Sequence, residues 1–404
     1  MDGFHLDVLV LGVLLVGGAL ISGITHRSFL SLTALYVVAG IVLGRSGFEV
    51  LDFHAGDPVV EDLAIVALVL ILFRDGLEVD AEMLQREWRV PLRKLVLAMP
   101  ITAAVIAVAA HAIVGLDWIQ AFLLGALLSP TDPVLSSSVV TNAIVPQRVR
   151  HSLNLESGLN DGLALAPVIA LAAALTPGNT DFVWWRFILE DVSIGIAAGF
   201  GIGMLAGILL PREDGASEVI PGHQRVLFAL GVAFGTYGAI AYLDHGNAFL
   251  AVFVAAITLG VRRPDLRHHV DEGADEIIEI VKLLVFVVFG SILSLDGLFE
   301  HGWGAIAMLV VTLLIARPVA IWIALAGVRP PLDVQTKAFI AWFGPKGVAT
   351  MTYSLFLLGE HVNGAVEITN LAALAVLGSV LAHGLTDAPG AAWMGRHATR
   401  AGSG

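Results

Sequence analysis

The chain contains no cysteine, few charged residues and no histidine spacing that is typical of a metal site. The missing cysteine excludes disulfides, thiolate metal ligands and catalysis by a thiol. Only 14% of the 404 residues are charged, whereas an ordinary soluble domain carries about a quarter. The net charge of −13 argues against a polyanionic partner. We therefore expect neither a cofactor nor a nucleic-acid partner, and we expect lipid to be the main solvent.

Long apolar runs are what the sequence has in abundance. Hydrophobic residues make up 57% of the chain, in runs of about 17 to 25 residues, the length that a helix needs to cross a hydrocarbon core. The first run, Val8 to Ile24, lacks the basic start and the cleavage site of a secretory signal, so we interpret it as a retained span. The pattern predicts about thirteen spans, at residues 7–24, 28–44, 59–77, 92–115, 118–143, 152–175, 188–211, 224–243, 247–262, 275–295, 303–326, 335–358 and 366–387.

The basic residues of the loops indicate how the spans are oriented. They fall in every second loop, with Arg45 and Arg186 as the exceptions. Because Lys and Arg accumulate in cytoplasmic loops, we expect the N-terminus outside and the C-terminus, with Arg396 and Arg400, in the cytoplasm. We expect one integral membrane domain over residues 1–404 in the plasma (inner) membrane, surrounded by membrane lipids, without a cytosolic regulatory domain.

Thirteen spans fit an all-α polytopic fold built as an inverted repeat, because span n and span n+7 have opposite orientations. The first repeat covers about 7–175, the linking span 188–211 and the second repeat about 224–387. Spans 5 and 12 carry matching breaks. Proline lacks an N–H, so each break frees backbone oxygens in mid-membrane that need a partner, which a bound cation can supply. The break residues are Ser129, Pro130, Thr131, Asp132 and Pro133 in span 5, and Gly344, Pro345, Lys346 and Gly347 in span 12.

Carboxylates inside spans 5 and 6 point to cation and proton chemistry. A charge in mid-span costs about 2.5–3.5 kcal/mol on insertion scales, so Asp132, Glu156 and Asp161 require an explanation. Span 6 forms one polar stripe, since Ser157 and Asp161 are one helical turn apart and so are Glu156 and Asn160. We expect Asp161 and Asp132, with Asn160, oxygens of Thr131 and Ser157 and freed carbonyls, to form the site that binds a hard monovalent cation or a proton. Burial disfavours the charged form of a carboxylate, so a proton competes for the same place.

Other polar residues within the spans are interpreted structurally. We expect Glu156, Arg317 and Lys346 to form neutralising ion pairs that hold helices together, with Glu156 and Arg317 as the favoured pair. The remaining expectations are a local i,i+3 pair of Lys282 with Glu279, satisfied or snorkelling groups at His111, His383 and Asp387, interfacial anchors at Arg74 and Asp75, and close helix packing at Gly199, Gly201 and Gly203.

Two strings in these spans carry a family resemblance. Thr131-Asp132-Pro133 in span 5 and the stretch from Glu156 to Gly162 in span 6 resemble the paired signatures of monovalent cation:proton antiporters of the NhaP and NHE branch. Supporting matches are Ala316-Arg317-Pro318 in span 11 and Gly344-Pro345-Lys346-Gly347 in span 12, so the resemblance covers the whole membrane domain.

The resemblance implies a homodimer, in which a six-helix core with two crossed, unwound helices moves against a dimerisation domain. It also implies cation binding by Asp161, Asp132, Thr131 and Ser157, and a Glu156–Arg317 pair that orients the site. Asn160, where the electrogenic branch has a second Asp, implies electroneutral exchange of one Na⁺ (alternatively K⁺ or Li⁺) for one proton, in the service of pH homeostasis. Lys346, where related sequences commonly have Arg, departs from the family pattern.

Two other classes of protein compete with this interpretation. Gly158-Leu159-Asn160-Asp161 is similar to the motif of intramembrane aspartyl proteases, but Asn160 replaces the second glycine and thirteen spans exceed that fold. A Na⁺-coupled organic-anion transporter on the same scaffold is the other alternative, although the acidic site would repel an anion. A channel is disfavoured because no repeated filter-like loop is present. We expect a transporter and not an enzyme.

Overall fold

The computed structural model describes residues 3–25, 32–79, 88–132, 137–178, 182–211, 220–329 and 331–402, and within these ranges it contains helices and no strand. The helices are α1 (Gly3–Thr25), α2 (Leu32–Leu43), α3 (Pro58–Glu78), α5 (Arg89–Arg93), α6 (Met99–Ala109), α7 (Trp118–Leu128), α8 (Ser137–Thr141), α9 (Gln147–Leu175), α10 (Trp184–Arg186), α11 (Ser193–Leu209), α12 (Gly222–Leu243), α13 (Ala248–Arg262), α14 (Asp265–Gly273), α15 (Asp275–Ile292), α16 (Leu295–Leu298), α17 (Trp303–Val310), α18 (Arg317–Ala324), α19 (Val334–Trp342), α20 (Val348–Gly359) and α21 (Ala365–Gly402).

In the described part of the chain, four π-helical segments connect several of these helices into longer ones: η1 (Lys94–Ala98), η2 (Ala110–Val114), η4 (Phe187–Val192) and η5 (Val311–Ala316). Six continuous helices among the described residues are long and apolar enough to cross a membrane, and shorter apolar helices accompany them. Each of the thirteen predicted spans coincides with a helix or a set of consecutive helices in the described residues. The all-α polytopic fold is therefore confirmed.

Two features differ from the predicted spans. The last helix, α21, continues through Pro389 to Gly402, well beyond the predicted end at residue 387. A short amphipathic helix, α14, precedes α15 and was not predicted, because its polar composition gives no span signal. The breaks predicted in spans 5 and 12 are present: residues 129–132 after α7, and residues 343–347 between α19 and α20, are not helical.

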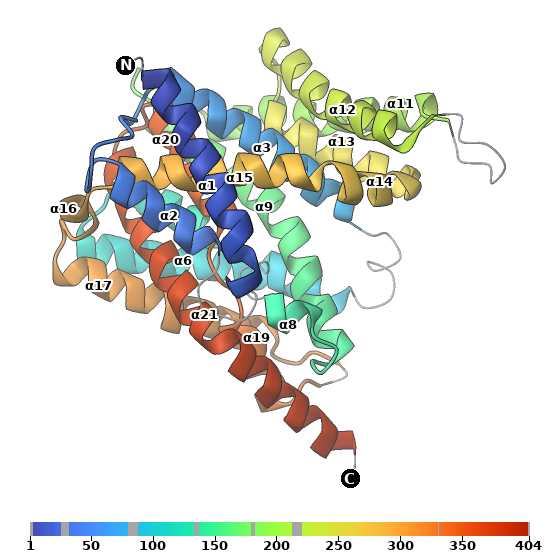
Figure 1. The fold of residues 1–404 in the computed structure, drawn as a ribbon. Coiled ribbons are helices and arrows are strands. Elements are labelled where there is room, and N and C mark those ends of the chain that lie inside the picture. The colour runs from blue at the N-terminus through green and yellow to red at the C-terminus, as the bar shows by residue number, and fades with distance from the viewer. Residues whose placement is uncertain are drawn as a thin grey trace.

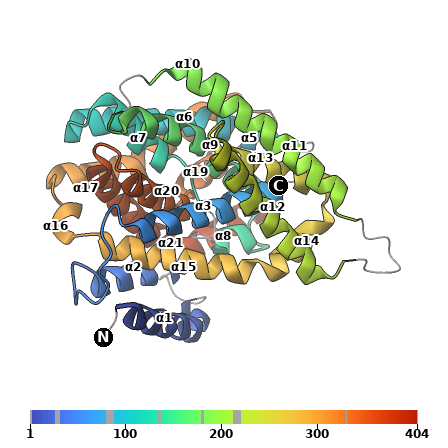
Figure 2. The same ribbon diagram turned by 90° about the horizontal axis from the view of Figure 1, so that it is seen from above.

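The helices pack around a central group, as two perpendicular views show (Figure 1, Figure 2). Helix α3 contacts α9, α13, α15 and α20, so it lies at the centre of the molecule. In the view from above, α1 is at one edge and α10 and α11 are at the opposite edge (Figure 2). The site described below lies where α3, α9 and α15 surround the two broken helices.

Glycines allow two of these helices to approach closely. A Cβ on Gly199 or Gly203 of α11 would collide with backbone atoms of Ala251 or Ala255 in α13, as expected for small-residue packing in a membrane. Gly201 was expected to share this role, but no atom lies within 4 Å of where its Cβ would be. Gly201 is on another face of α11, because residues two apart on a helix do not face the same way.

Candidate functional site

The non-helical stretches of the two broken helices cross and bond to each other. The backbone N–H of Asp132 donates to the carbonyl of Pro345 at 2.8 Å, and the N–H of Val348 donates to Asp132 Oδ2 at 3.3 Å. Thr350 Oγ1 donates to the carbonyl of Leu127 at 2.9 Å. A Cβ on Gly347 would collide with the Asp132 side chain, so the crossing needs a residue without a side chain there. Asp132 is thus part of the crossing itself.

Two buried cations partner the carbonyls that the breaks set free. Lys346 Nζ donates to the carbonyls of Pro130, at 3.1 Å, and Ser129, at 3.4 Å, where α7 ends. Arg317 Nη2 donates to the carbonyls of Ile340 and Phe343, both at 3.3 Å, where α19 ends. Positive charge is favourable at the C-terminal end of a helix. Cationic side chains therefore neutralise the ends of both half-helices. From the sequence, a bound cation was expected to partner these carbonyls.

The carbonyl of Thr131 is also occupied by protein donors. Ser157 Oγ donates to it at 3.0 Å and Asn160 Nδ2 at 2.9 Å, and the same amide donates to Thr131 Oγ1 at 3.1 Å. Asn160 Oδ1 is buried and has no hydrogen-bond partner among the described residues. Ser157 and Asn160 thus fasten the unwound stretch to α9. Pro133, which was expected to take part in this break, lies outside the described residues.

Four carboxylates line one cavity of about 530 Å³ beside the crossing: Asp75 and Glu78 of α3, Asp132 of the unwound stretch and Asp161 of α9. Asp75 and Asp132 both act electrostatically on Asp161, and Asp132 also acts on Asp75. Tyr353 donates its hydroxyl to the Asp161 carbonyl at 2.7 Å and holds α9 against α20. Ser157 lines the same cavity. The structure therefore brings Asp161, Asp132 and Ser157 together, as the sequence predicted.

Asp75 was expected at the interface as an anchor, and that expectation is wrong. Ile71, Asp75 and Glu78 are three or four residues apart in α3, so they share one face of the helix, and this face lines the cavity. The helical spacing of Asp75 and Glu78 was a usable signal. The sequence could not show that this face of α3 is turned toward Asp161, because that depends on how α3 packs between α9 and α15.

A separate buried cluster contains Glu156. Arg317 donates to both carboxylate oxygens of Glu156, at 2.9 and 3.0 Å. Lys94 Nζ lies 2.6 Å from Glu156 Oε2 and donates to the carbonyl of Ser152 at 2.7 Å. Lys94 is near the start of the predicted span 92–115, and its side chain is fully buried. The cluster thus holds two cations and one carboxylate, and it joins α9 to α18 and η1.

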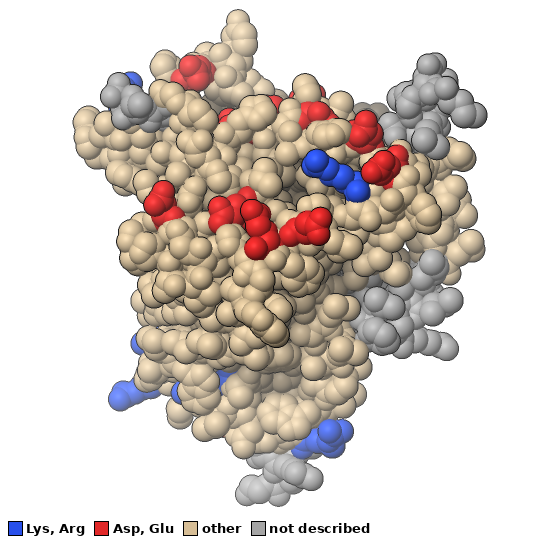
Figure 3. All heavy atoms as spheres, turned by 90° about the vertical axis from the view of Figure 1, so that its left-hand side faces the viewer, with Lys and Arg blue, Asp and Glu red and all other residues tan. Residues whose placement is uncertain are grey.

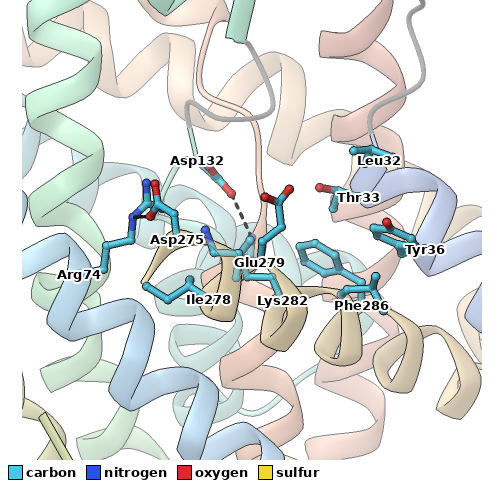
Figure 4. A pocket seen from close by; sticks show the side chains of 12 residues that line it. Leu32, Thr33, Tyr36, Arg74, Asp132, Asp275, Ile278, Glu279, Lys282 and Phe286 are labelled. Carbon is cyan, nitrogen blue, oxygen red and sulfur yellow. Dashed lines mark hydrogen bonds and ion pairs between the residues drawn. The ribbon is translucent and has the colours of Figure 1, made fainter. Parts of the chain in front are cut away.

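A second cavity, of about 190 Å³, lies between α2 and α15 and meets the first one (Figure 4). Thr33, Tyr36 and Glu279 line only this second cavity, whereas Arg74, Asp132, Lys282 and Val348 line both. Arg74 pairs with Glu78 at 3.2 Å and with Asp275 at 3.1 Å. Lys282 was expected to pair with Glu279 on its own helix, and the structure shows no such ion pair. The Lys282 side chain instead forms part of the wall shared by the two cavities.

The remaining polar side chains have local partners. His111 Nδ1 lies 2.8 Å from the Leu116 carbonyl, and its ring stacks on Trp118. His383 is buried between the carbonyls of Ser379 and Trp342, each 2.8 Å from a ring nitrogen. Asp387 Oδ1 accepts a hydrogen bond from the backbone N–H of Val139 in α8. None of the three lines either cavity.

Carboxylate and hydroxyl oxygens that converge on one cavity can bind a hard cation or a proton. Among the described residues no group of three or more His, Cys, Asp or Glu side chains is arranged to hold a metal ion.

Comparisons with known proteins agree with this arrangement. Residues 12–393 match the family described as "Sodium/hydrogen exchanger, transmembrane". The K(+)/H(+) antiporter NhaP of Alkalimonas amylolytica is 27% identical over 399 residues, which cover 98% of this chain and 68% of that protein. A probable Na(+)/H(+) antiporter 2 of Methanocaldococcus jannaschii is 23% identical over 369 residues, which cover 87% of this chain and 84% of that protein. The chain thus spans about two thirds of the length of the first relative.

The fold is similar to that of a solved antiporter structure. The sodium proton antiporter MjNhaP1 from Methanocaldococcus jannaschii superposes with a TM-score of 0.78 at 18% identity, covering 95% of this chain and 100% of that one. These relatives are transporters and not enzymes, which removes the intramembrane protease alternative. Because the family match extends over nearly the whole chain, the chain belongs to the sodium/hydrogen exchanger family.

Proposed function

We propose that this chain is a secondary antiporter that exchanges a monovalent cation for a proton by competition at Asp161. One observation supports this most: Asp161, Asp75 and Asp132 come from three different elements and line a single cavity beside the crossing of the broken helices. Carboxylate oxygens suit a hard cation and also accept a proton. The same three groups can therefore bind either ion, and binding of one ion lowers the affinity for the other.

The proposed exchange is electroneutral, with one cation for one proton. Asp75 and Asp161 line the same cavity, and carboxylates that share one site repel each other when both are ionised, which favours one proton on the pair. A monovalent cation that replaces this proton leaves the net charge of the site unchanged. Asn160 adds no ionisable group next to Asp161, because its side chain is a neutral amide. This amide donates hydrogen bonds to Thr131. A site that carries the same charge in both loaded forms moves no net charge across the membrane in a complete exchange cycle, so the cycle does no net electrical work.

The crossing is proposed to carry the site between the two faces of the membrane. Asp132, Pro345 and Val348 tie the two unwound stretches together, and Ser157 and Asn160 tie them to α9. Glu156 and Arg317 join the same α9 to the end of α19. These links couple the ion-binding residues to one group of helices. We propose that Glu156–Arg317 orients this group and does not bind the transported ion.

K⁺ and Na⁺ are the two cations to be compared. The relatives named above include a K(+)/H(+) antiporter and a probable Na(+)/H(+) antiporter. From the sequence we proposed Na⁺, with K⁺ or Li⁺ as alternatives, and the ligand types present suit each of them. We further propose a homodimer in the plasma (inner) membrane that serves pH homeostasis, as the family resemblance implies.

The N-terminus is proposed to be outside and the C-terminus in the cytoplasm. Figure 3 shows the end of the molecule at the left of Figure 1, where acidic side chains gather and few basic ones lie among them. Helix α16, which carries Asp296, is at this end (Figure 1). Arg267 of α14 and the exposed Asn154 of α9 border the larger cavity. With the proposed orientation, this cavity opens toward the cytoplasm.

The test is transport by the purified protein in vesicles that contain a pH dye. An imposed Na⁺ or K⁺ gradient should drive proton movement in wild type, and Asp161→Asn should abolish it. Clamping the membrane potential at different values should leave the wild-type rate unchanged if exchange is one for one. Glu300→Gln, at an exposed position far from either cavity, is the matched control. Substantial exchange by Asp161→Asn would refute the proposed competition at this carboxylate.

A further inference from the structure

Three cations of the described residues line the larger cavity: Arg74, Arg267 and Lys282. Arg74 is paired with Glu78 and Asp275, and Arg267 donates to the carbonyl of Val79. The Lys282 ammonium has neither a hydrogen bond nor an ion pair with any described residue. Lys282 is therefore the one positive charge in the described wall of this cavity that is not already committed to a partner.

The position of Lys282 places its charge on the carboxylate cluster. Its side chain is partly exposed and lines both cavities, at the wall where they meet beside Asp132. In Figure 4 it extends from α15 toward the side where Asp132 and Asp275 lie. The charge of Lys282 acts on both Asp75 and Asp161. A positive charge held inside a membrane span is costly, so its place next to three carboxylates calls for a functional explanation.

A lysine side chain is suited to move its ammonium between two groups of carboxylates. Its ammonium is a compact point charge on a flexible four-carbon stem with three rotatable donors. Asp75 and Asp161 line only the larger cavity, whereas Glu279, one turn earlier on α15, lines only the smaller one. Asp132, like Lys282, lines both. The ammonium can thus approach the cluster when no ion is there and withdraw toward Glu279 when an ion binds.

We propose that Lys282 is a tethered cation that competes with the transported ion for the Asp75, Asp132 and Asp161 carboxylates and thereby sets the affinity of the site. This inference rests on the proposed function. A molecule whose ammonium occupies the cluster cannot bind the ion. The apparent affinity is therefore the intrinsic affinity multiplied by the fraction of molecules in which the cluster is unoccupied. Lys282 thus sets the affinity of the site and is not a ligand of the transported ion.

The test compares the cation concentration for half-maximal exchange in wild type, Lys282→Gln and Lys282→Arg, in vesicles at alkaline pH, where protons compete least. Lys282→Gln should lower this concentration about fivefold or more, a typical size for coupling between two sites. Lys282→Arg keeps the charge and should stay near wild type. Lys337→Gln is the matched control, because Lys337 of α19 lies over the ring of Trp322 in α18 and lines neither cavity.

A second readout separates this role from a structural one. Added Na⁺ or K⁺ should raise the thermal unfolding temperature of detergent-solubilised protein, and in Lys282→Gln this rise should saturate at a lower concentration. A residue that only supports the fold would shift the unfolding temperature without changing the concentration dependence. If Lys282→Gln does not fold, Lys282→Met, which keeps the apolar stem, replaces it.

An unchanged or raised half-maximal concentration in Lys282→Gln would overturn the inference. If wild type exchanges ions and Asp161→Asn does not, this outcome leaves the proposed function intact. A wild type that exchanges no cation for protons in any gradient would overturn both proposals.

Discussion

At the scale of single residues, buried cations explain how a chain with two broken helices can be stable in lipid. Lys346 and Arg317 each satisfy two carbonyls at the end of a half-helix, and Arg317 is in turn neutralised by Glu156. An unsatisfied backbone group in hydrocarbon costs several kcal/mol. The breaks therefore do not need the transported ion in order to persist, which leaves the carboxylates free to bind and release it.

The Glu156 cluster allows a quantitative prediction. Glu156→Gln leaves Arg317 and Lys94 buried without a counter-charge, and removing one partner of a buried pair typically costs about 3–5 kcal/mol. Lys94→Met should cost less, roughly 1–3 kcal/mol, because Glu156 keeps its two bonds to Arg317. The double variant should be more stable than Glu156→Gln alone. The measurement is the free energy of unfolding in detergent.

A double-mutant cycle is the appropriate control for that prediction, since the three residues touch each other. If the two single-variant losses simply add in the double variant, Lys94 and Glu156 do not interact, and the cluster as described would be contradicted.

Residue-level reasoning from the sequence was partly successful. Asp132, Asp161 and Ser157 could be grouped because Pro and Gly breaks and helical spacing mark them. Asp75 and Lys94 could not be assigned, because each is next to a basic residue near a span end, where either side of the interface is plausible. Which way these side chains turn is decided by the packing of α3 and η1 against α9, and that packing leaves no local pattern.

At the scale of helices, hydrophobic length was sufficient to place the spans but not their internal geometry. Every predicted span coincides with a helix, because a bilayer of fixed thickness requires a run of fixed length. The π-helical segments η1, η2, η4 and η5 were not predicted, since a single extra residue per turn does not disturb an apolar run. Helix α14 was not predicted either, because it is polar and lies outside the apolar runs.

Helix α14 begins with a charge cluster that yields a pH prediction. Asp265 accepts hydrogen bonds from Arg263, at 2.7 and 3.0 Å, and from Arg225, at 3.0 Å, and both arginines are almost fully buried. The Arg263 hydrogen bond is the main reason that the pKa of Asp265 is lower than usual. Stability from a carboxylate with a lowered pKa is fully present above its unfolded pKa, about 3.9, and is lost as the pH falls through the folded value.

Asp265→Asn should therefore destabilise the protein at neutral pH, by roughly 1–3 kcal/mol, because two buried guanidiniums lose their counter-charge. The difference from wild type should shrink once the pH falls below about 3.9. Thermal unfolding in detergent across this range measures it, and Asp296→Asn, at an exposed position, is the control. A difference that is independent of pH would mean that the charge of Asp265 is not what stabilises this corner.

At the scale of the whole molecule, the separation of charge between the two ends predicts the orientation in the membrane. The absence of cysteine makes any introduced cysteine unique. A membrane-impermeant maleimide applied to intact cells should label Asp296→Cys, at the acidic end. The same reagent should label Lys337→Cys only after the membrane is permeabilised. Labelling in the reverse order would contradict the N-terminus-outside orientation.

The family and fold could be inferred at this scale because several weak signals agreed: alternating loop charge, matched breaks in spans 5 and 12, and carboxylates beside them. The cavities could not be inferred, since a cavity forms where helices from distant parts of the chain leave space. The meeting of α3, α9 and α15 around the crossing is such a place, and it brings Asp75 and Lys282 to the site.

The central claim is that a cation and a proton compete for the same carboxylates, and proton release on cation binding tests it most directly. Purified wild type in weakly buffered detergent solution, near the pH at which exchange is half-maximal, should release protons when Na⁺ or K⁺ is added, up to about one per chain if Asp75 and Asp161 share a single proton. Asp161→Asn should release none. Saturable cation binding by wild type without any proton release would contradict the account.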